Sequence, residues 1–100
     1  MERMKRMPKL SVLMGIYNEK KKEQVELAIS SILNQSYRDF EFIICDDGST
    51  EEFFLWLQEY CRTDKRIRLI RNEKNAGLAV ALNRCLTEAK GEYIARMDAD

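Results

Sequence analysis

The fold is decided by the stretch Phe40-Glu-Phe-Ile-Ile-Cys-Asp-Asp-Gly-Ser-Thr-Glu-Glu52. Its first six residues form a short, nearly continuous apolar run, which is typical of a parallel strand covered on both faces. Asp46 and Asp47 end the run. Ser49 and Glu52 then have the spacing of a capping box, in which the two side chains satisfy free amides at the start of a helix. A buried strand that passes directly into a capped helix predicts a β-α unit.

The same alternation continues on both sides of this unit. Three further apolar runs occupy residues 10–17, 67–71 and 93–97. Between the runs, apolar residues recur at i, i+3, i+4, i+7 and i+8, and each such stripe predicts a helix packed on a sheet. The stripes are Val25, Ala28, Ile29, Ile32 and Leu33; Phe53, Trp56, Leu57, Tyr60 and Cys61; Leu78, Ala81, Leu82, Cys85 and Leu86. We predict an α/β fold, a Rossmann-like β-α-β-α-β-α-β chain with a mainly parallel sheet and residues 67–71 as an edge strand.

Length and composition exclude several classes of protein. One hundred residues fit one small domain, and 45% hydrophobic with 34% charged residues indicates a folded chain. Lys+Arg and Asp+Glu balance at 17 each, which disfavours nucleic acid as a partner. The chain has no histidine, so a histidine base and a histidine-ligated metal are excluded. Three widely spaced cysteines do not form a zinc site, and their odd number favours the cytoplasm.

Residues 1–8 form a basic N-terminal lead. The apolar run that follows it, residues 10–17, is too short to span a membrane and lacks the features of a signal peptide. A frayed terminus explains the lead better than contact with an anionic lipid surface. The expected location is cytoplasmic, with peripheral association at the inner face of the membrane as the alternative.

Ligands of parallel α/β sheets bind at the carboxyl ends of the strands. Four segments with polar side chains are expected there: Gly15-Ile-Tyr-Asn-Glu19, Asp46-Asp-Gly-Ser49, residues 71–77 and Asp98-Ala-Asp100. Asp46 and Asp47 either cap the next helix or accept hydrogen bonds from a base or a ribose. Asp98 and Asp100 form either a solvated turn or a site for Mg²⁺ or Mn²⁺, which prefer oxygen ligands.

Two further features of these segments also have two interpretations each. Tyr17 either packs at the end of its strand or stacks on a nucleobase. Asn75 either caps the third helix, or the segment up to Gly77 presents free amides to an anion.

Four motifs in this order resemble the start of a family 2 glycosyltransferase with a GT-A fold. They read S-V-L-M-G-I-Y-N-E, Q-S-Y-R-D-F-E-F-I-I-C-D-D-G-S-T, N-A-G-L-A-V-A-L-N and G-E-Y-I-A-R-M-D-A-D, and the resemblance spans residues 9–100. It implies binding of a nucleotide diphosphate sugar, UDP-linked, with Mg²⁺ or Mn²⁺. The whole enzyme would transfer the sugar to an acceptor with inversion, and the acceptor is unknown.

The resemblance also assigns roles to individual residues. Gly15, Tyr17 and Asp47 would line the base pocket, with Glu19 beside it, and Asp46 would support the loop. Gly77 would pass near the diphosphate. Asp98 would contact the ribose or the metal, and Asp100 would ligate the metal. Glycine at position 15, where relatives often have proline or threonine, leaves only its backbone to contact the base.

The resemblance covers the nucleotide half of the family's pattern. In the family the general base and the acceptor site follow this half, so we expect residues 9–100 to bind the donor without transferring sugar. The alternatives are a nucleotidyltransferase-like domain, a receiver-like domain and a non-catalytic binding module. A nucleotidyltransferase-like domain would need a glycine-rich basic loop after the first strand, and a receiver-like domain would need a fifth strand. Self-association is expected through the fourth strand, as an open edge.

Overall fold

The chain alternates strands and helices along its whole described length. The computed structural model describes residues 7–18 and 22–98. The elements are β1 (Leu10–Ile16), α1 (Lys22–Leu33), β2 (Phe40–Asp47), α2 (Glu51–Cys61), β3 (Ile67–Asn72), α3 (Leu78–Glu88) and β4 (Tyr93–Arg96). Each predicted strand and helix is confirmed.

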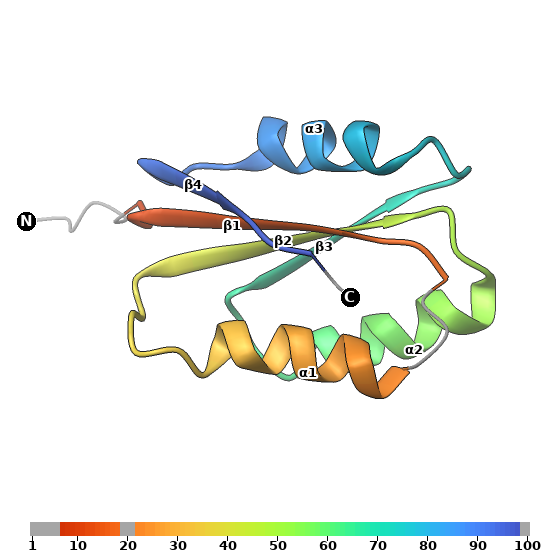
Figure 1. The fold of residues 1–100 in the computed structure, drawn as a ribbon, viewed down its shortest axis with the longest axis horizontal. Coiled ribbons are helices and arrows are strands. Elements are labelled where there is room, and N and C mark those ends of the chain that lie inside the picture. The colour runs from red at the N-terminus through yellow and green to blue at the C-terminus, as the bar shows by residue number, and fades with distance from the viewer. Residues whose placement is uncertain (1–6, 19–21, 99–100) are drawn as a thin grey trace, which may run out of the picture.

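The four strands form one parallel sheet in the order β3-β2-β1-β4. Helices α1 and α2 cover one face and α3 covers the other, which makes three layers (Figure 1). The chain builds outward from β1 to β2 and β3, and α3 then returns it to the far side of β1. The strand order therefore reverses between β1 and β4, and β3 is an edge strand, as the sequence predicts.

Two apolar cores lie on the two faces of the sheet. One joins the α1 and α2 stripes to alternate residues of β1 and β2, and the other joins Ala81 and Cys85 of α3 to Leu13, Ile43 and Cys45. All three cysteines are free and buried, as expected of core residues. Burial raises the pKa of the Cys61 thiol to about 12, so it stays protonated and unreactive at neutral pH.

Local signals place the helix starts one to two residues away from the observed caps. Thr50, not Ser49, caps α2, since its hydroxyl accepts a bond from the amide of Phe53 at 3.3 Å. Gly77, not Asn75, is the cap residue of α3, and no side chain caps that helix. Ser49 and Asn75 bond instead to residues about 30 positions away, so tertiary contacts override the local capping pattern.

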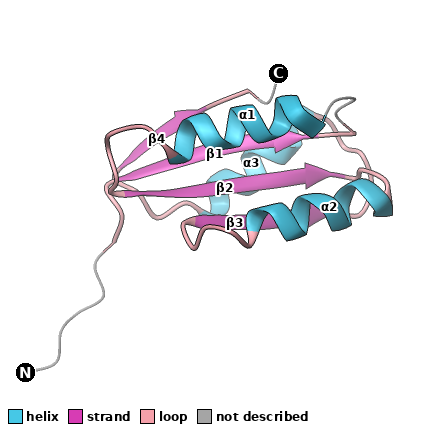
Figure 2. Cartoon of the chain, turned by 90° about the horizontal axis from the view of Figure 1, so that it is seen from below, coloured by secondary structure: helices cyan, strands magenta, loops and turns pink. Residues whose placement is uncertain are grey.

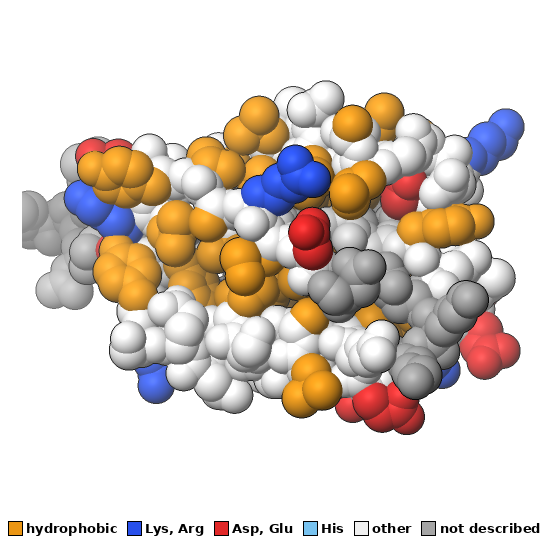
Figure 3. Space-filling view, in the orientation of Figure 1, with side chains coloured by type: hydrophobic (Ala, Val, Ile, Leu, Met, Phe, Trp, Pro, Cys, Tyr) orange, Lys and Arg blue, Asp and Glu red, His pale blue; other side chains and the backbone are white. Residues whose placement is uncertain are grey.

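Strand β4 is the least covered part of the sheet. It is an edge strand, and Tyr93, Ile94 and Met97 are 59%, 46% and 42% exposed. Apolar side chains gather on this face of the molecule (Figure 3). The open edge expected of the fourth strand is therefore present. None of the described helices is long and apolar enough to cross a membrane.

Candidate functional site

The loops that follow β1, β2 and β3 gather at the carboxyl edge of the sheet (Figures 1 and 2). The strand order reverses between β1 and β4, and α/β sheets bind their ligands beyond the strand ends at such a reversal. Tyr17 follows β1 there. β4 ends earlier, at Arg96, which pairs with Leu13 of β1, and Asp98 follows it. The structure thus brings the described residues of the first three predicted segments to one edge.

Asp47 is the best-connected polar side chain of this edge. Its Oδ1 accepts bonds from Asn72 Nδ2 at 2.9 Å and from the Ala76 amide at 3.0 Å. Its Oδ2 accepts bonds from Asn75 Nδ2 at 2.9 Å and from the Gly77 amide at 2.8 Å. A carboxylate offers about four acceptor positions, so all of them are used. Asp47 therefore holds the β3–α3 loop onto the end of β2.

The electrostatics of Asp47 follow from these four bonds. Burial alone would raise the pKa of this carboxyl, but donors from Asn72, Ala76 and Gly77 outweigh burial and hold the pKa below its usual range. Asp47 is 3% exposed. It is therefore a stable anion at neutral pH, although hardly any of it touches solvent.

Two neighbours tighten the same loop. Arg84 Nη1 of α3 donates to the carbonyl of Arg71 at 2.7 Å and to Asn72 Oδ1 at 2.6 Å, which leaves the Asn72 amide nitrogen free for Asp47. Gly48 has φ of +77°, and a Cβ there would lie 2.3 Å from the backbone nitrogen of Asn75. Only glycine allows this turn and this close approach.

Asp46 has the opposite environment. Successive residues of a strand face opposite sides of the sheet, so Asp46 faces the α1 and α2 layer while Asp47 faces α3. Asp46 is 0% exposed, and neither carboxylate oxygen meets hydrogen-bond geometry with a donor of residues 7–18 or 22–98. Burial raises its pKa, and the nearby groups of Ser49 and the charge of Arg71 offset this only in part. Asp47 holds the β3–α3 loop, and the loop-supporting role that the resemblance gave to Asp46 stays a prediction.

The end of β1 carries three of the predicted residues. Gly15 is buried beneath α3, where a Cβ would lie 2.7 Å from Leu78 Cδ1, so helix packing explains the glycine. Tyr17 is 47% exposed at the edge. Glu19 lies outside the described residues.

The predicted metal ligands are described only in part. Asp98 is exposed, one residue after an amide of Met97 that still donates to the Leu13 carbonyl of β1 at 2.9 Å. Its carboxylate is the hard oxygen ligand that Mg²⁺ or Mn²⁺ prefers. Asp100 lies outside the described residues, and within residues 7–18 and 22–98 no three acidic or cysteine side chains cluster as a metal site. The donor chemistry fits the ion, and the pair remains a prediction.

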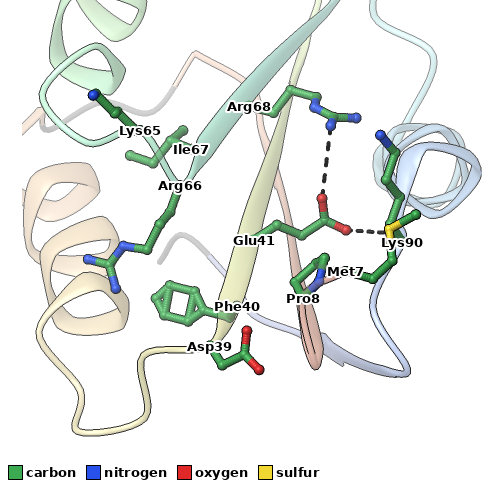
Figure 4. Close-up of a pocket in the computed structure, with 10 residues that line it drawn as sticks. All are labelled: Met7, Pro8, Asp39, Phe40, Glu41, Lys65, Arg66, Ile67, Arg68 and Lys90. Atoms are coloured by element: carbon green, nitrogen blue, oxygen red, sulfur yellow. Dashed lines mark hydrogen bonds and ion pairs between the residues drawn. The ribbon is translucent and has the colours of Figure 1, made fainter. Parts of the chain in front are cut away.

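A hollow of about 480 Å³ lies at the opposite, amino end of the sheet (Figure 4). Its floor and rim contain Phe40, Glu41 and Arg68. Glu41 accepts bonds from Ser11 Oγ and the Lys90 amide, and Arg68 pairs with Glu41 and with an acid of α3. These charges are neutralised within the chain, and no predicted site residue lies there, so the carboxyl edge remains the candidate site.

Three residues that build the edge had no role predicted from the sequence, although two of them lie in the polar segments expected there. Asn18, Asn72 and Arg84 make their bonds to the carboxyl edge through tertiary contacts. Their one signal in the sequence is position, because asparagines follow β1 and end β3 where turns and caps are expected. Nothing local indicates which partner each side chain meets.

The reversed strand order and the acidic carboxyl edge define a doubly wound α/β domain of the class that binds a ligand beyond its strand ends. A sequence profile of glycosyl transferase family 2 matches residues 11–100, and the chain belongs to this family.

Curated relatives and a solved structure that are similar to the chain agree with this family assignment. The chain is 47% identical over 94 residues to "Putative glycosyltransferase EpsE" of Bacillus subtilis, which covers 93% of this chain and 33% of that protein. It is 37% identical over 97 residues to "Chondroitin synthase" of Escherichia coli, covering 97% and 14%. The mannosyltransferase PcManGT of Pyrobaculum calidifontis, solved with GDP-Man and Mn²⁺, superposes with a TM-score of 0.81 at 27% identity, covering 95% and 28%. The chain spans about a third or less of the length of these proteins.

Proposed function

We propose that the chain is the donor-binding part of a glycosyltransferase and holds a nucleotide diphosphate sugar at the carboxyl edge of its sheet. The observation that carries the proposal is the reversal of strand order between β1 and β4, with the exposed Tyr17 and Asp98 following these two strands. A related mannosyltransferase was solved with such a donor and Mn²⁺, which supports the same ligand class here.

Each residue of the edge has a proposed role. Tyr17 stacks on the base, with the backbone of Gly15 behind it and Glu19 beside it. Asp47 shapes the base pocket through the loop it holds, since a base N–H would have to replace one of its four present bonds. Gly77 is the cap residue of α3, whose first amides face the diphosphate.

Asp98 and Asp100 are the proposed ligands of Mg²⁺ or Mn²⁺. A divalent ion bound there supplies Lewis-acid stabilisation of the charge that develops on a leaving diphosphate. This chemistry needs no histidine, which the chain lacks.

Further proposals concern the whole protein. We propose that it transfers the sugar with inversion and that its general base and acceptor site lie outside these 100 residues. The proposed location is the cytoplasm, with peripheral association at the inner face of the membrane as the alternative. Three free thiols support a reducing compartment.

The proposal is tested by titrating the ¹⁵N-labelled chain with UDP, GDP and ADP, with and without Mg²⁺. We expect saturable shifts with UDP at Tyr17 and Asp98 that strengthen with the ion. GDP is compared directly, because the related mannosyltransferase holds GDP-Man. Substituting Mn²⁺ should broaden the resonances beside Asp98 first, since a paramagnetic ion acts over a short range.

A pair of variants on either side of β4 separates a bound metal from general charge effects. Asp98→Asn should abolish the dependence on the ion. Glu92→Gln removes one negative charge at the amino end of the same strand, where Glu92 pairs with Lys9 at 2.8 Å, and should change nothing. A folded chain that ignores all three nucleotides, or equal effects of the two variants, would contradict the proposal.

A further inference from the structure

Asn18 has an unusual backbone at the end of β1. Its φ is +40°, and among the described residues it is the one non-glycine with a positive φ. Asparagine tolerates this left-handed conformation better than most residues because its short polar side chain bonds locally. Asn18 directly follows the exposed Tyr17.

Two hydrogen bonds join Asn18 to the start of α2. Its backbone amide donates to Ser49 Oγ at 2.8 Å, and its Oδ1 accepts a bond from the Thr50 amide at 2.9 Å. Ser49 is 6% exposed, so the first bond is shielded from water. We call this pair of bonds the Asn18 clamp. It closes a loop of about thirty residues and fastens the β1–α1 turn to the β2–α2 turn.

We infer that Asn18 is a positioning residue for donor binding, an inference that rests on the proposed function. Ile16 on one side of Tyr17 is 1% exposed in the core, and Asn18 on the other side is bonded to α2. The backbone of Tyr17 is therefore held at both ends before any ligand arrives. A binding group that is already ordered loses less entropy on binding, which raises affinity without a new contact.

Three substitutions of Asn18 separate its backbone from its side chain. Asn18→Gly keeps the left-handed conformation and the amide donor but removes the acceptor for Thr50. Asn18→Asp keeps the acceptor and adds negative charge at a helix N-terminus, which is favourable there. Asn18→Ala loses the acceptor and also strains the backbone. We expect glycine to weaken nucleotide binding about fivefold, the equivalent of one neutral hydrogen bond, alanine to weaken it more, and aspartate to restore it.

Thr50→Ala is the matched control. It removes the hydroxyl that caps α2 but keeps the amide that donates to Asn18. A purely structural role for this region predicts that loss of the cap weakens binding as much as loss of the clamp. A positioning role predicts a lower urea midpoint for Thr50→Ala with unchanged affinity, and a lower affinity for Asn18→Gly with a smaller change in midpoint.

The measurement is the dissociation constant of UDP with Mg²⁺, from the chemical shift of Tyr17, beside the urea midpoint of each variant. Failure of the wild-type chain to bind any nucleotide would reject the proposed function and, with it, the positioning role. Binding by the wild-type chain with equal affinity in Asn18→Gly would reject the positioning role alone. Weakening by Thr50→Ala as great as that by Asn18→Gly would reduce Asn18 to a structural residue.

Discussion

Replacing Asp47 by asparagine tests how the carboxyl edge is held together. The carboxylate receives four donors, two on each oxygen. In Asp47→Asn one oxygen becomes an NH₂ group, which cannot accept and which faces two N–H donors. The side chain keeps its size, so the substitution removes two hydrogen bonds and the charge without creating a cavity.

The expected loss follows from the count of bonds. A hydrogen bond to a charged group contributes about 1.5–3 kcal/mol, so two lost bonds cost about 3–6 kcal/mol. Asn75 and Ala76 are exposed, so water can satisfy the N–H groups that these two residues now donate to Asp47. We therefore expect the lower end, a decrease of about 3 kcal/mol in the free energy of unfolding. Small domains have about 5–15 kcal/mol in total, so the variant should still fold.

The assay is urea unfolding followed by far-UV circular dichroism, with Asp46→Asn as the control. Asp46 is the adjacent residue and equally buried, but its oxygens have no hydrogen-bond partner among residues 7–18 and 22–98. The same substitution should therefore be neutral or stabilising at position 46. A decrease below about 1 kcal/mol for Asp47→Asn, or an equal decrease for both variants, would refute the assignment of the four bonds as the main support of the loop.

Three further results are expected. The stability advantage of wild type over Asp47→Asn should disappear as pH falls below about 4, because the lowered pKa of Asp47 contributes stability that is lost when the carboxylate is protonated. The stability gained by Asp46→Asn should instead grow as pH rises from about 4, because the raised pKa of Asp46 makes its ionisation costly in the folded state. Gly48→Ala should destabilise the chain by about 3 kcal/mol or more, because strain at its positive φ adds to overlap with the backbone of Asn75. Gly77→Ala, with φ of +102° and ψ of 155° but nothing within 4 Å, should cost only the backbone strain of about 1–3 kcal/mol. Unfolding midpoints that reverse this order would contradict the packing. The chain should self-associate at high concentration through β4, and Ile94→Lys should reduce this in sedimentation velocity; a monomeric wild type would count against it.

The layered fold could be predicted because its signals are local and repeated. A helix stripe such as Val25, Ile29 and Ile32 specifies both the helix and the face that it buries. Near-continuous apolar runs specify parallel strands covered on both sides. The edge position of β3 followed from alternation at residues 67–71, which are only partly buried.

The site could be predicted by location and not by bonding. Ser49 and Asn75 have the residue types of helix caps, and the sequence alone gives no reason to prefer a distant partner. Ser49 accepts from Asn18, and Asn75 donates to Asp47, across 31 and 28 residues. Such pairs form only after the sheet has brought the loops together, so no window of sequence contains both partners.

The acidic pair shows how one dipeptide meets different environments on the two faces of a sheet. Because Asp46 and Asp47 point to opposite faces, identical side chains acquire pKa shifts of opposite sign. Asp47 orders the β3–α3 loop on one face, while the Asn18 clamp closes the β1–α1 turn on the other. Asn18 and the β3–α3 loop are thus held in place by the folded chain, so a ligand that meets the exposed Tyr17 need not order them. Rigid loops around a few exposed contact residues are what a site needs if it is to select among nucleotides rather than adapt to each of them.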